Sequence, residues 1–232
     1  MVTGSGQSAK ESRRSVMNVL DINSIDTNVS EELRAQMRAE LPEVEEIKNE
    51  DLRQRVINAW ALAIHNSSFA SLRDMPPSGN PGKMVLKRGD QTDHIRGVTR
   101  AAMALADEFA ASNPDMKIDR DIIIAGGLCH DVGKPWEYDA NNLKRWREAP
   151  RRVGLPSLRH NAYGAFICLT VGLPEEVAHM AAAHSGEGEL LVRSLACTIV
   201  HVADIGYWTI MLAGDLIQPG TESQKYIRPI SL

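Results

Sequence analysis

The stretch Ile122-Ile-Ile-Ala-Gly-Gly-Leu-Cys-His-Asp-Val-Gly-Lys134 decides how the rest of the chain is interpreted. Its apolar run predicts a buried helix over about 119–132, and that helix ends on an imidazole and a carboxylate, His130 and Asp131. Burying an unpaired polar group is costly, and burying an unpaired charge costs more. These two side chains therefore need buried partners, and a metal ion accepts both.

Bulk composition narrows the class of protein. The chain has 232 residues and a net charge of -4 at pH 7, so we expect no nucleic-acid partner. Residues 1–28 are expected to form a disordered segment, since the first fifteen are polar and contain no signal-peptide core. No apolar run is expected to be long enough to span a membrane.

The cysteines point to the compartment. Cys129, Cys168 and Cys197 lie in apolar stretches, are odd in number and form no CxxC pair. Such cysteines are typical of buried, reduced thiols, so we predict a cytoplasmic protein.

Hydrophobic periodicity predicts an all-α fold, because no stretch alternates with the period of a strand. The long segments 67–91 and 134–157 carry prolines and polar residues and are interpreted as loops. We divide the chain into N-terminal helices with a loop over 29–91, a metal-binding domain over 92–214, and a C-terminal tail over 215–232. The predicted helices begin at Ser30 and end near Pro42, and then cover 50–65, 92–112, 119–132, 159–171, 174–184 and 188–213.

Four further residues are candidate metal ligands: His94, His160, His184 and Asp204. Asp204 is the most telling, because it lies mid-helix with apolar residues on nearly every side, where a carboxylate needs a cation. Each of the three histidines taken alone also fits an ordinary capping, exposed or core role.

The order His, His-Asp, His, His, Asp across consecutive helices resembles the HD superfamily of metal-dependent enzymes over about residues 92–213. The resemblance implies an HD-domain helical bundle, here with extra N-terminal helices. It implies one or two divalent ions among Fe, Mn, Co, Ni and Zn, and if there are two, Asp131 bridges them. The ligands it implies are His94, His130, Asp131 and Asp204 for one ion, with His160 and His184 added in the two-metal branches.

The resemblance also implies chemistry. The HDxGK form gives Asp131 and Lys134 catalytic roles in a phosphohydrolase, in which a metal-activated water attacks a small phosphorylated metabolite or nucleotide. Lys134, Arg159, Arg96 and Glu187 are candidate contacts for this small, anionic substrate. A di-iron HD oxygenase that cleaves a C–C or C–P bond is the alternative, because the same six ligands serve both chemistries.

The sequence gives less support to two other hypotheses about function. The run Ser185-Gly-Glu-Gly-Glu departs from the signature of HD-GYP cyclic-dinucleotide hydrolases. A non-catalytic HD fold lacks support, since all six ligand positions are filled. The N-terminal helices are expected to pack on the same chain, with a homodimer interface as the alternative.

Overall fold

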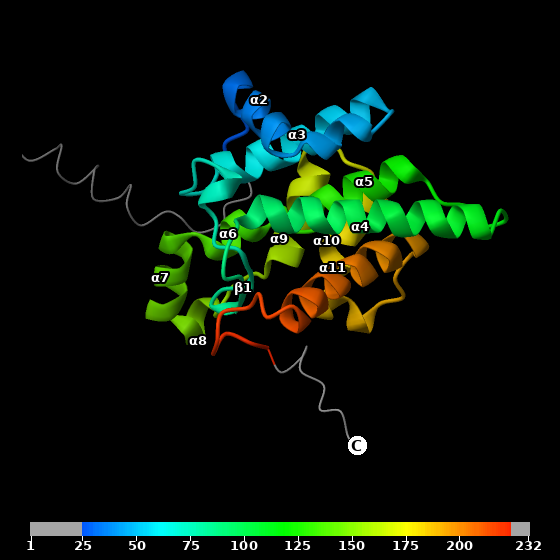
Figure 1. Cartoon of the computed structure of the whole chain (residues 1–232). Helices are drawn as coiled ribbons and strands as arrows, with labels where there is room; N and C mark the ends of the chain where they lie inside the picture. The colour runs from blue at the N-terminus through cyan, green and yellow to red at the C-terminus, as the bar shows by residue number, and fades with distance from the viewer. Residues whose placement is uncertain (1–24, 224–232) are drawn as a thin grey trace, which may run out of the picture.

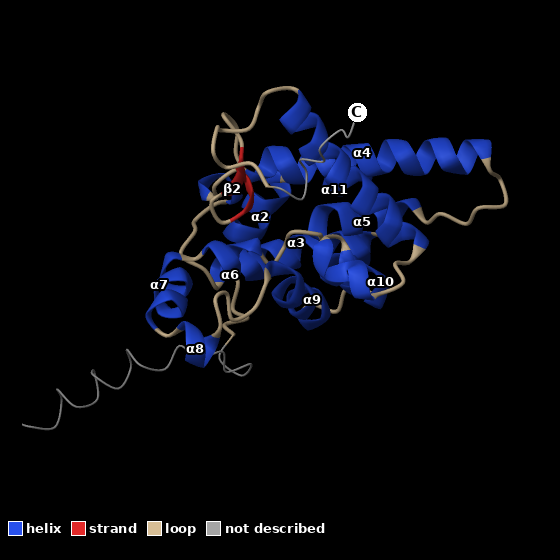
Figure 2. Cartoon of the chain, turned by 90° about the horizontal axis from the view of Figure 1, so that it is seen from below, coloured by secondary structure: helices blue, strands red, loops and turns tan. Residues whose placement is uncertain are grey.

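The computed structural model describes residues 25–223, and the fold is helical (Figures 1 and 2). The predictions for residues 1–24 and for 224–232 lie outside the described residues. The helices are α2 (Glu31–Glu40), α3 (Glu50–His65), α4 (Gln91–Ser112), α5 (Arg120–Cys129), α6 (Lys134–Tyr138), α7 (Ala140–Glu148), α8 (Pro150–Val153), α9 (His160–Thr170), α10 (Glu175–Ala183) and α11 (Leu195–Ala213).

Helix α5 is the centre of the core. It packs against α4, α10, α11 and α3, and its residues from Ile123 onward are buried. Two glycines permit this close packing. A Cβ on Gly127 would lie 3.1 Å from the Thr99 Cα on α4, and one on Gly126 would lie 2.1 Å from the Met180 methyl on α10. The end of α5, where the His-Asp pair follows, is therefore held tightly between its neighbours.

The N-terminal helices pack on the same chain, as expected. Ser30 and Asn49 cap α2 and α3 through their side chains. Trp60 of α3 is fully buried, and its indole N–H donates to the Leu128 carbonyl of α5 at 2.9 Å. Figure 1 shows α2 and α3 lying across one side of the bundle. A homodimer interface stays a prediction.

The segment 134–157 is not the loop that its prolines suggested. It forms α6, α7 and α8, with Pro135 and Pro150 in the first turns of their helices. Proline is tolerated there because the first N–H groups of a helix have no intrahelical partner. Asp139 caps α7 by accepting from two backbone N–H groups. The prolines thus mark helix starts rather than a loop.

The segment 67–91 contains a small sheet that the all-α prediction missed. Strands β1 (Ser78–Asn80) and β2 (Lys83–Val85) form an antiparallel hairpin. The C-terminal segment adds to it, since Ile217 bridges Leu86 and the Gln218 N–H donates to the Val85 carbonyl at 2.7 Å. Residues 216–221 of the predicted C-terminal tail therefore pair with the hairpin. Three-residue strands are too short to show an alternating pattern.

Helix α11 corrects two expectations. It begins at Leu195, where Ser194 caps it, and a short 3-10 helix over Gly186–Leu190 precedes it. It is also long and apolar enough to cross a membrane by length and composition, contrary to the expectation from sequence. In this structure α11 packs against α4, α5 and α10, and it brings Asp204 to the middle of the bundle.

Candidate metal centre

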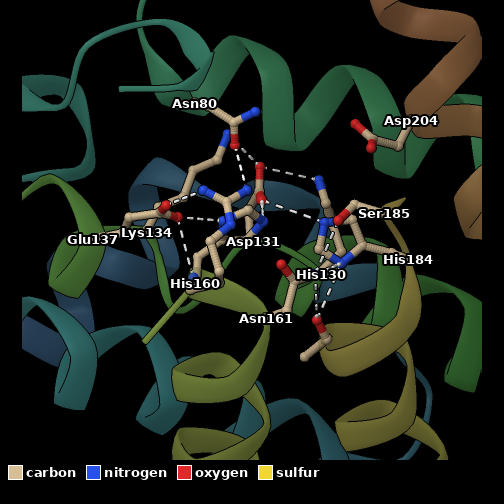
Figure 3. A network of polar contacts seen from close by, with 12 residues as sticks. Asn80, His130, Asp131, Lys134, Glu137, His160, Asn161, His184, Ser185 and Asp204 are labelled. Carbon is tan, nitrogen blue, oxygen red and sulfur yellow. Dashed lines mark hydrogen bonds and ion pairs between the residues drawn. The ribbon is translucent and has the colours of Figure 1, made fainter. Parts of the chain in front are cut away.

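The six candidate ligands come from five helices and lie close together, and Figure 3 labels all of them except His94. Four lie at helix ends: His94 in the first turn of α4, His130 directly after α5, His160 at the start of α9 and His184 directly after α10. Asp131 follows His130, and Asp204 lies within α11. All six are at most 5% exposed. The fold therefore removes these polar groups from water together.

Three imidazole and carboxylate groups form a first cluster around one oxygen of Asp131. The Nε2 atoms of His94 and His130 lie 3.0 and 3.3 Å from Asp131 Oδ2, and 3.2 Å from each other. Asp204 Oδ1 lies 3.4 Å from His94 Nε2. Asp204 thus lies beside this cluster, next to His94.

A second cluster faces the other oxygen of Asp131. His160 Nε2 lies 3.5 Å and His184 Nε2 lies 3.6 Å from Asp131 Oδ1. Two trios could each hold a metal ion, because their ligand atoms lie within 4.8 Å of one another: His94, His130 and Asp131, and Asp131, His160 and His184. The carboxylate of Asp131 is shared between the two clusters.

Hydrogen bonds at the far side of each ring fix the orientation of three imidazoles. The Nδ1 of His130 donates to the Gly127 carbonyl at 2.6 Å, and that of His184 donates to the Ala181 carbonyl at 3.1 Å. The Nδ1 of His160 donates to the Glu137 carboxylate at 2.5 Å. Because these acceptors cannot donate, each Nδ1 carries the proton and each Nε2 presents its lone pair to Asp131.

The residues fit a divalent cation. Within the described chain, Asp204 Oδ1 is buried and has no hydrogen-bond partner. The Nε2 atoms of His94 and His130 face each other across 3.2 Å, where lone pairs repel unless a cation or a proton lies between them. A ligand set of imidazoles and carboxylates suits Fe, Mn, Co, Ni or Zn.

Protonation states agree with metal binding. Burial lowers the pKa of His94 to about 4, so its ring is neutral near pH 7. Burial alone would raise the pKa of Asp131, but the positive charge of Lys134 holds it well below its usual range. Asp131 therefore stays ionised in the interior.

Lys134 is a buried residue of the site rather than a surface lysine after a helix end. It is 2% exposed, and its Nζ donates to Asp131 Oδ2 at 2.7 Å and to the Ser78 carbonyl at 2.9 Å. The β1 strand thus holds Lys134 against the shared carboxylate.

Two buried residues of the site, Glu137 and Gln91, were not predicted from the sequence. Glu137 is 1% exposed and binds both His160 and Arg159, but its segment was interpreted as a polar loop. Gln91 is fully buried, and its amide donates to Asp131 Oδ2 at 3.2 Å. Only the position of Gln91 three residues before His94 could have drawn attention to it.

A pocket of about 330 Å³ opens onto the clusters, which is at the small end of the range for ligand sites. Lys134, Arg159 and Glu187, three of the four predicted substrate contacts, line it, and their contact with a substrate stays a prediction. Its lining is Gly79, Asn80, Met84, Asp131, Lys134, Arg159, His160, His184, Ser185, Gly186, Glu187, Asp204, Trp208 and Ser223.

Arg96, the fourth predicted substrate contact, lies away from the other three. It lies outside this pocket lining and binds both oxygens of the buried Glu43 at 3.0 Å. Arg100 joins the same carboxylate at 2.9 Å. Arg96 thus fastens α4 to the N-terminal region and does not line this pocket.

Comparisons with known proteins agree with this geometry. A family model described as HD domain matches residues 92–205. The dihydroneopterin 2',3'-cyclic phosphate phosphodiesterase of Methanocaldococcus jannaschii is 28% identical over 166 residues, which cover 69% of this chain and 64% of the relative. The match thus spans slightly less than two thirds of the relative's length. No solved structure matches. Residues 92–205 of this chain are therefore an HD domain, with buried His and Asp metal-ligand clusters that share Asp131.

Proposed function

We propose that this protein is a metal-dependent phosphodiesterase that hydrolyses a small metabolite carrying a cyclic phosphate. The observation that carries the proposal is the Asp131 carboxylate, whose two oxygens face two different imidazole clusters. A carboxylate in that position can bridge two ions. The phosphodiesterase activity in the relative's name supports the same class of reaction.

The two clusters would hold two divalent ions. His94, His130 and Asp204 would bind one, His160 and His184 the other, and Asp131 both. When bound, such ions polarise phosphoryl oxygens and lower the pKa of a water between them.

Lys134 supplies positive charge from the chain itself. Its ammonium group has three N–H donors, and Asp131 and Ser78 accept two of them. The third is left for an anionic phosphoryl oxygen in the pocket that Lys134 lines. This hydrogen bond strengthens as negative charge builds up on phosphorus in the transition state.

The reaction balances with water alone. The oxygen of one water forms a bond to phosphorus, and one P–O bond of the cyclic phosphate breaks. The water supplies the two protons that the product needs, one of which goes to the oxygen that leaves phosphorus. The product is a phosphomonoester with a free hydroxyl group beside it.

The test uses protein purified without chelator, with its metal content measured. We expect two divalent ions per chain and hydrolysis of 2',3'-cyclic nucleotides or of bis(p-nitrophenyl) phosphate. Asp131→Ala should abolish hydrolysis, whereas Glu148→Gln, an exposed change on α7, should not alter it. Hydrolysis that survives Asp131→Ala would refute the proposal.

The same experiment also tests the alternative function, a di-iron oxygenase. Two irons per chain, no ester hydrolysis, and oxygen consumption with a polyol or a phosphonate would favour cleavage of a C–C or C–P bond instead.

A further inference from the structure

The guanidinium of Arg159 is held on three sides by the chain itself. Its Nε donates to Glu187 at 2.7 Å, one terminal nitrogen donates to Asn80 Oδ1 at 2.6 Å, and the other binds the buried Glu137. Two carboxylates against one cation give this group a net negative charge. The arrangement disfavours an anion at Arg159 and leaves the phosphate to the Lys134 end of the pocket.

Glu187 presents unused hydrogen-bond acceptors to the pocket. It lines the pocket, and its side chain is 37% exposed. One oxygen accepts from Arg159 and the other from Ser185 at 2.5 Å. A carboxylate accepts about four hydrogen bonds, so each oxygen can accept another. Burial would raise the pKa of Glu187, but Ser185 and Arg159 lower it to about 2, so it is ionised near pH 7.

Asn80 lines the same pocket and offers the opposite group. Its Oδ1 accepts from Arg159, which fixes the amide so that Nδ2 is the free end. Among residues 25–223 this Nδ2 has no hydrogen-bond partner. Glu187 and Asn80 thus lie on two sides of one guanidinium, the first as an acceptor and the second as a donor.

We propose that Glu187 and Asn80 recognise the heterocyclic end of the substrate, an inference that rests on the phosphodiesterase function above. Glu187 accepts from a ring N–H and an adjacent exocyclic amine, and Asn80 donates to the neighbouring carbonyl. The site therefore selects a base edge on which these three groups stand side by side, as they do in guanine.

Adenine presents a mismatched edge. Its ring nitrogen is an acceptor, which would face the ionised Glu187, and it has no carbonyl for Asn80. An acceptor that faces a carboxylate gains no hydrogen bond there and gives up the one that it made to water. Inosine keeps the carbonyl and the ring N–H but lacks the amine. Comparison with inosine therefore separates the contribution of the amine from that of the other two groups.

The experiment compares hydrolysis of the 2',3'-cyclic phosphates of guanosine, inosine and adenosine. The wild-type kcat/KM should fall in that order, with guanosine preferred over adenosine by roughly 5- to 150-fold. Glu187→Gln should lower this ratio at least fivefold, and the ratio does not depend on how much of the variant is folded. Asn80→Leu should lower the kcat/KM of the guanosine and inosine substrates relative to that of adenosine. The ratio of kcat/KM between guanosine and inosine should stay the same.

Glu189→Gln is the matched control. Glu189 lies in the same 3-10 helix and binds Arg193 at 2.9 Å, outside the pocket lining. The Glu189→Gln variant should have the same ratio of kcat/KM between guanosine and adenosine as the wild type. A wild-type ratio near one would overturn the inference. So would a Glu187→Gln variant that slows all three substrates equally, since a purely structural role predicts that result.

Failure of the proposed function gives a different result, namely no hydrolysis of any of the three. Equilibrium dialysis with guanosine 2'-monophosphate and adenosine 2'-monophosphate then tests base recognition alone. Tighter binding of the guanosine compound that is lost in Glu187→Gln supports the inference, and equal binding of the two overturns it.

Discussion

Glu137 and His160 are joined by two hydrogen bonds. The Glu137 carboxylate accepts from the His160 backbone N–H at 3.1 Å and from its Nδ1 at 2.5 Å. The first bond holds the start of α9, and the second turns Nε2 of the same residue toward Asp131. One side chain thus sets both the position and the tautomer of a candidate ligand.

Glu137→Gln should weaken binding at the cluster formed by His160 and His184. The amide cannot hold the His160 tautomer as the carboxylate does, and loss of such a partner costs about 10- to 100-fold in metal affinity. Competitive metal titration against a chelator measures the change. Glu148→Gln on α7 serves as the control and should titrate like the wild type. Unchanged affinity for both ions in Glu137→Gln would contradict the assigned role.

Lys134→Met should separate catalysis from metal binding. The variant removes the donor to the phosphoryl oxygen, so kcat should fall by roughly 10²–10³ while metal content stays near that of the wild type. Without metal, Asp131 loses its cation at 2.7 Å, and unfolding free energy should fall by about 3–5 kcal/mol. Lys144→Met, at an exposed site on α7, is the control. A Lys134→Met enzyme with normal kcat would remove Lys134 from the reaction.

The metal-free protein should lose stability as the pH falls from about 6.5 to about 4. Burial lowers the pKa of His94 to about 4, so in that interval the unfolded chain takes up a proton that the folded chain does not. A shift of this size corresponds to roughly 3 kcal/mol. Urea unfolding of chelator-treated protein at several pH values measures how steeply the unfolding free energy changes with pH. His94→Gln should show a shallower slope, and an identical slope would be inconsistent with a neutral, buried His94.

Gly133→Ala should disrupt the site through the backbone. A Cβ at Gly133 would lie 2.0 Å from the His160 carbonyl oxygen and 2.6 Å from the Gly164 backbone nitrogen, so α9 must move away. We expect loss of metal from the His160 cluster and a clear drop in melting temperature. Gly206→Ala is the control, because nothing lies within 4 Å of its Cβ. Its higher helix propensity should stabilise α11 by up to about 1 kcal/mol.

The sequence by itself determined the helical class and the six residues that the fold brings together. Local reasons suffice for the helices and for the two aspartates, whereas the histidines were recognised from the order His, His-Asp, His, His, Asp and its resemblance to the HD superfamily. The apolar periodicity of 50–65 and of 119–132 dictates which faces are buried, and caps such as Ser30 set helix starts. Asp131 and Asp204 stand in apolar helical surroundings, where a carboxylate is too costly to bury without a cation. These arguments need no knowledge of which helices are neighbours.

The tertiary structure alone decided what surrounds the ligands. Whether Pro135 starts a helix or belongs to a loop depends on packing, and with it depends whether Glu137 reaches His160. Arg159 was expected to attract an anion. In the structure two carboxylates, one 22 and the other 28 residues away in sequence, bind its guanidinium. Such contacts join segments that are far apart along the chain, so their partners and geometry follow from how the helices pack and not from any local pattern.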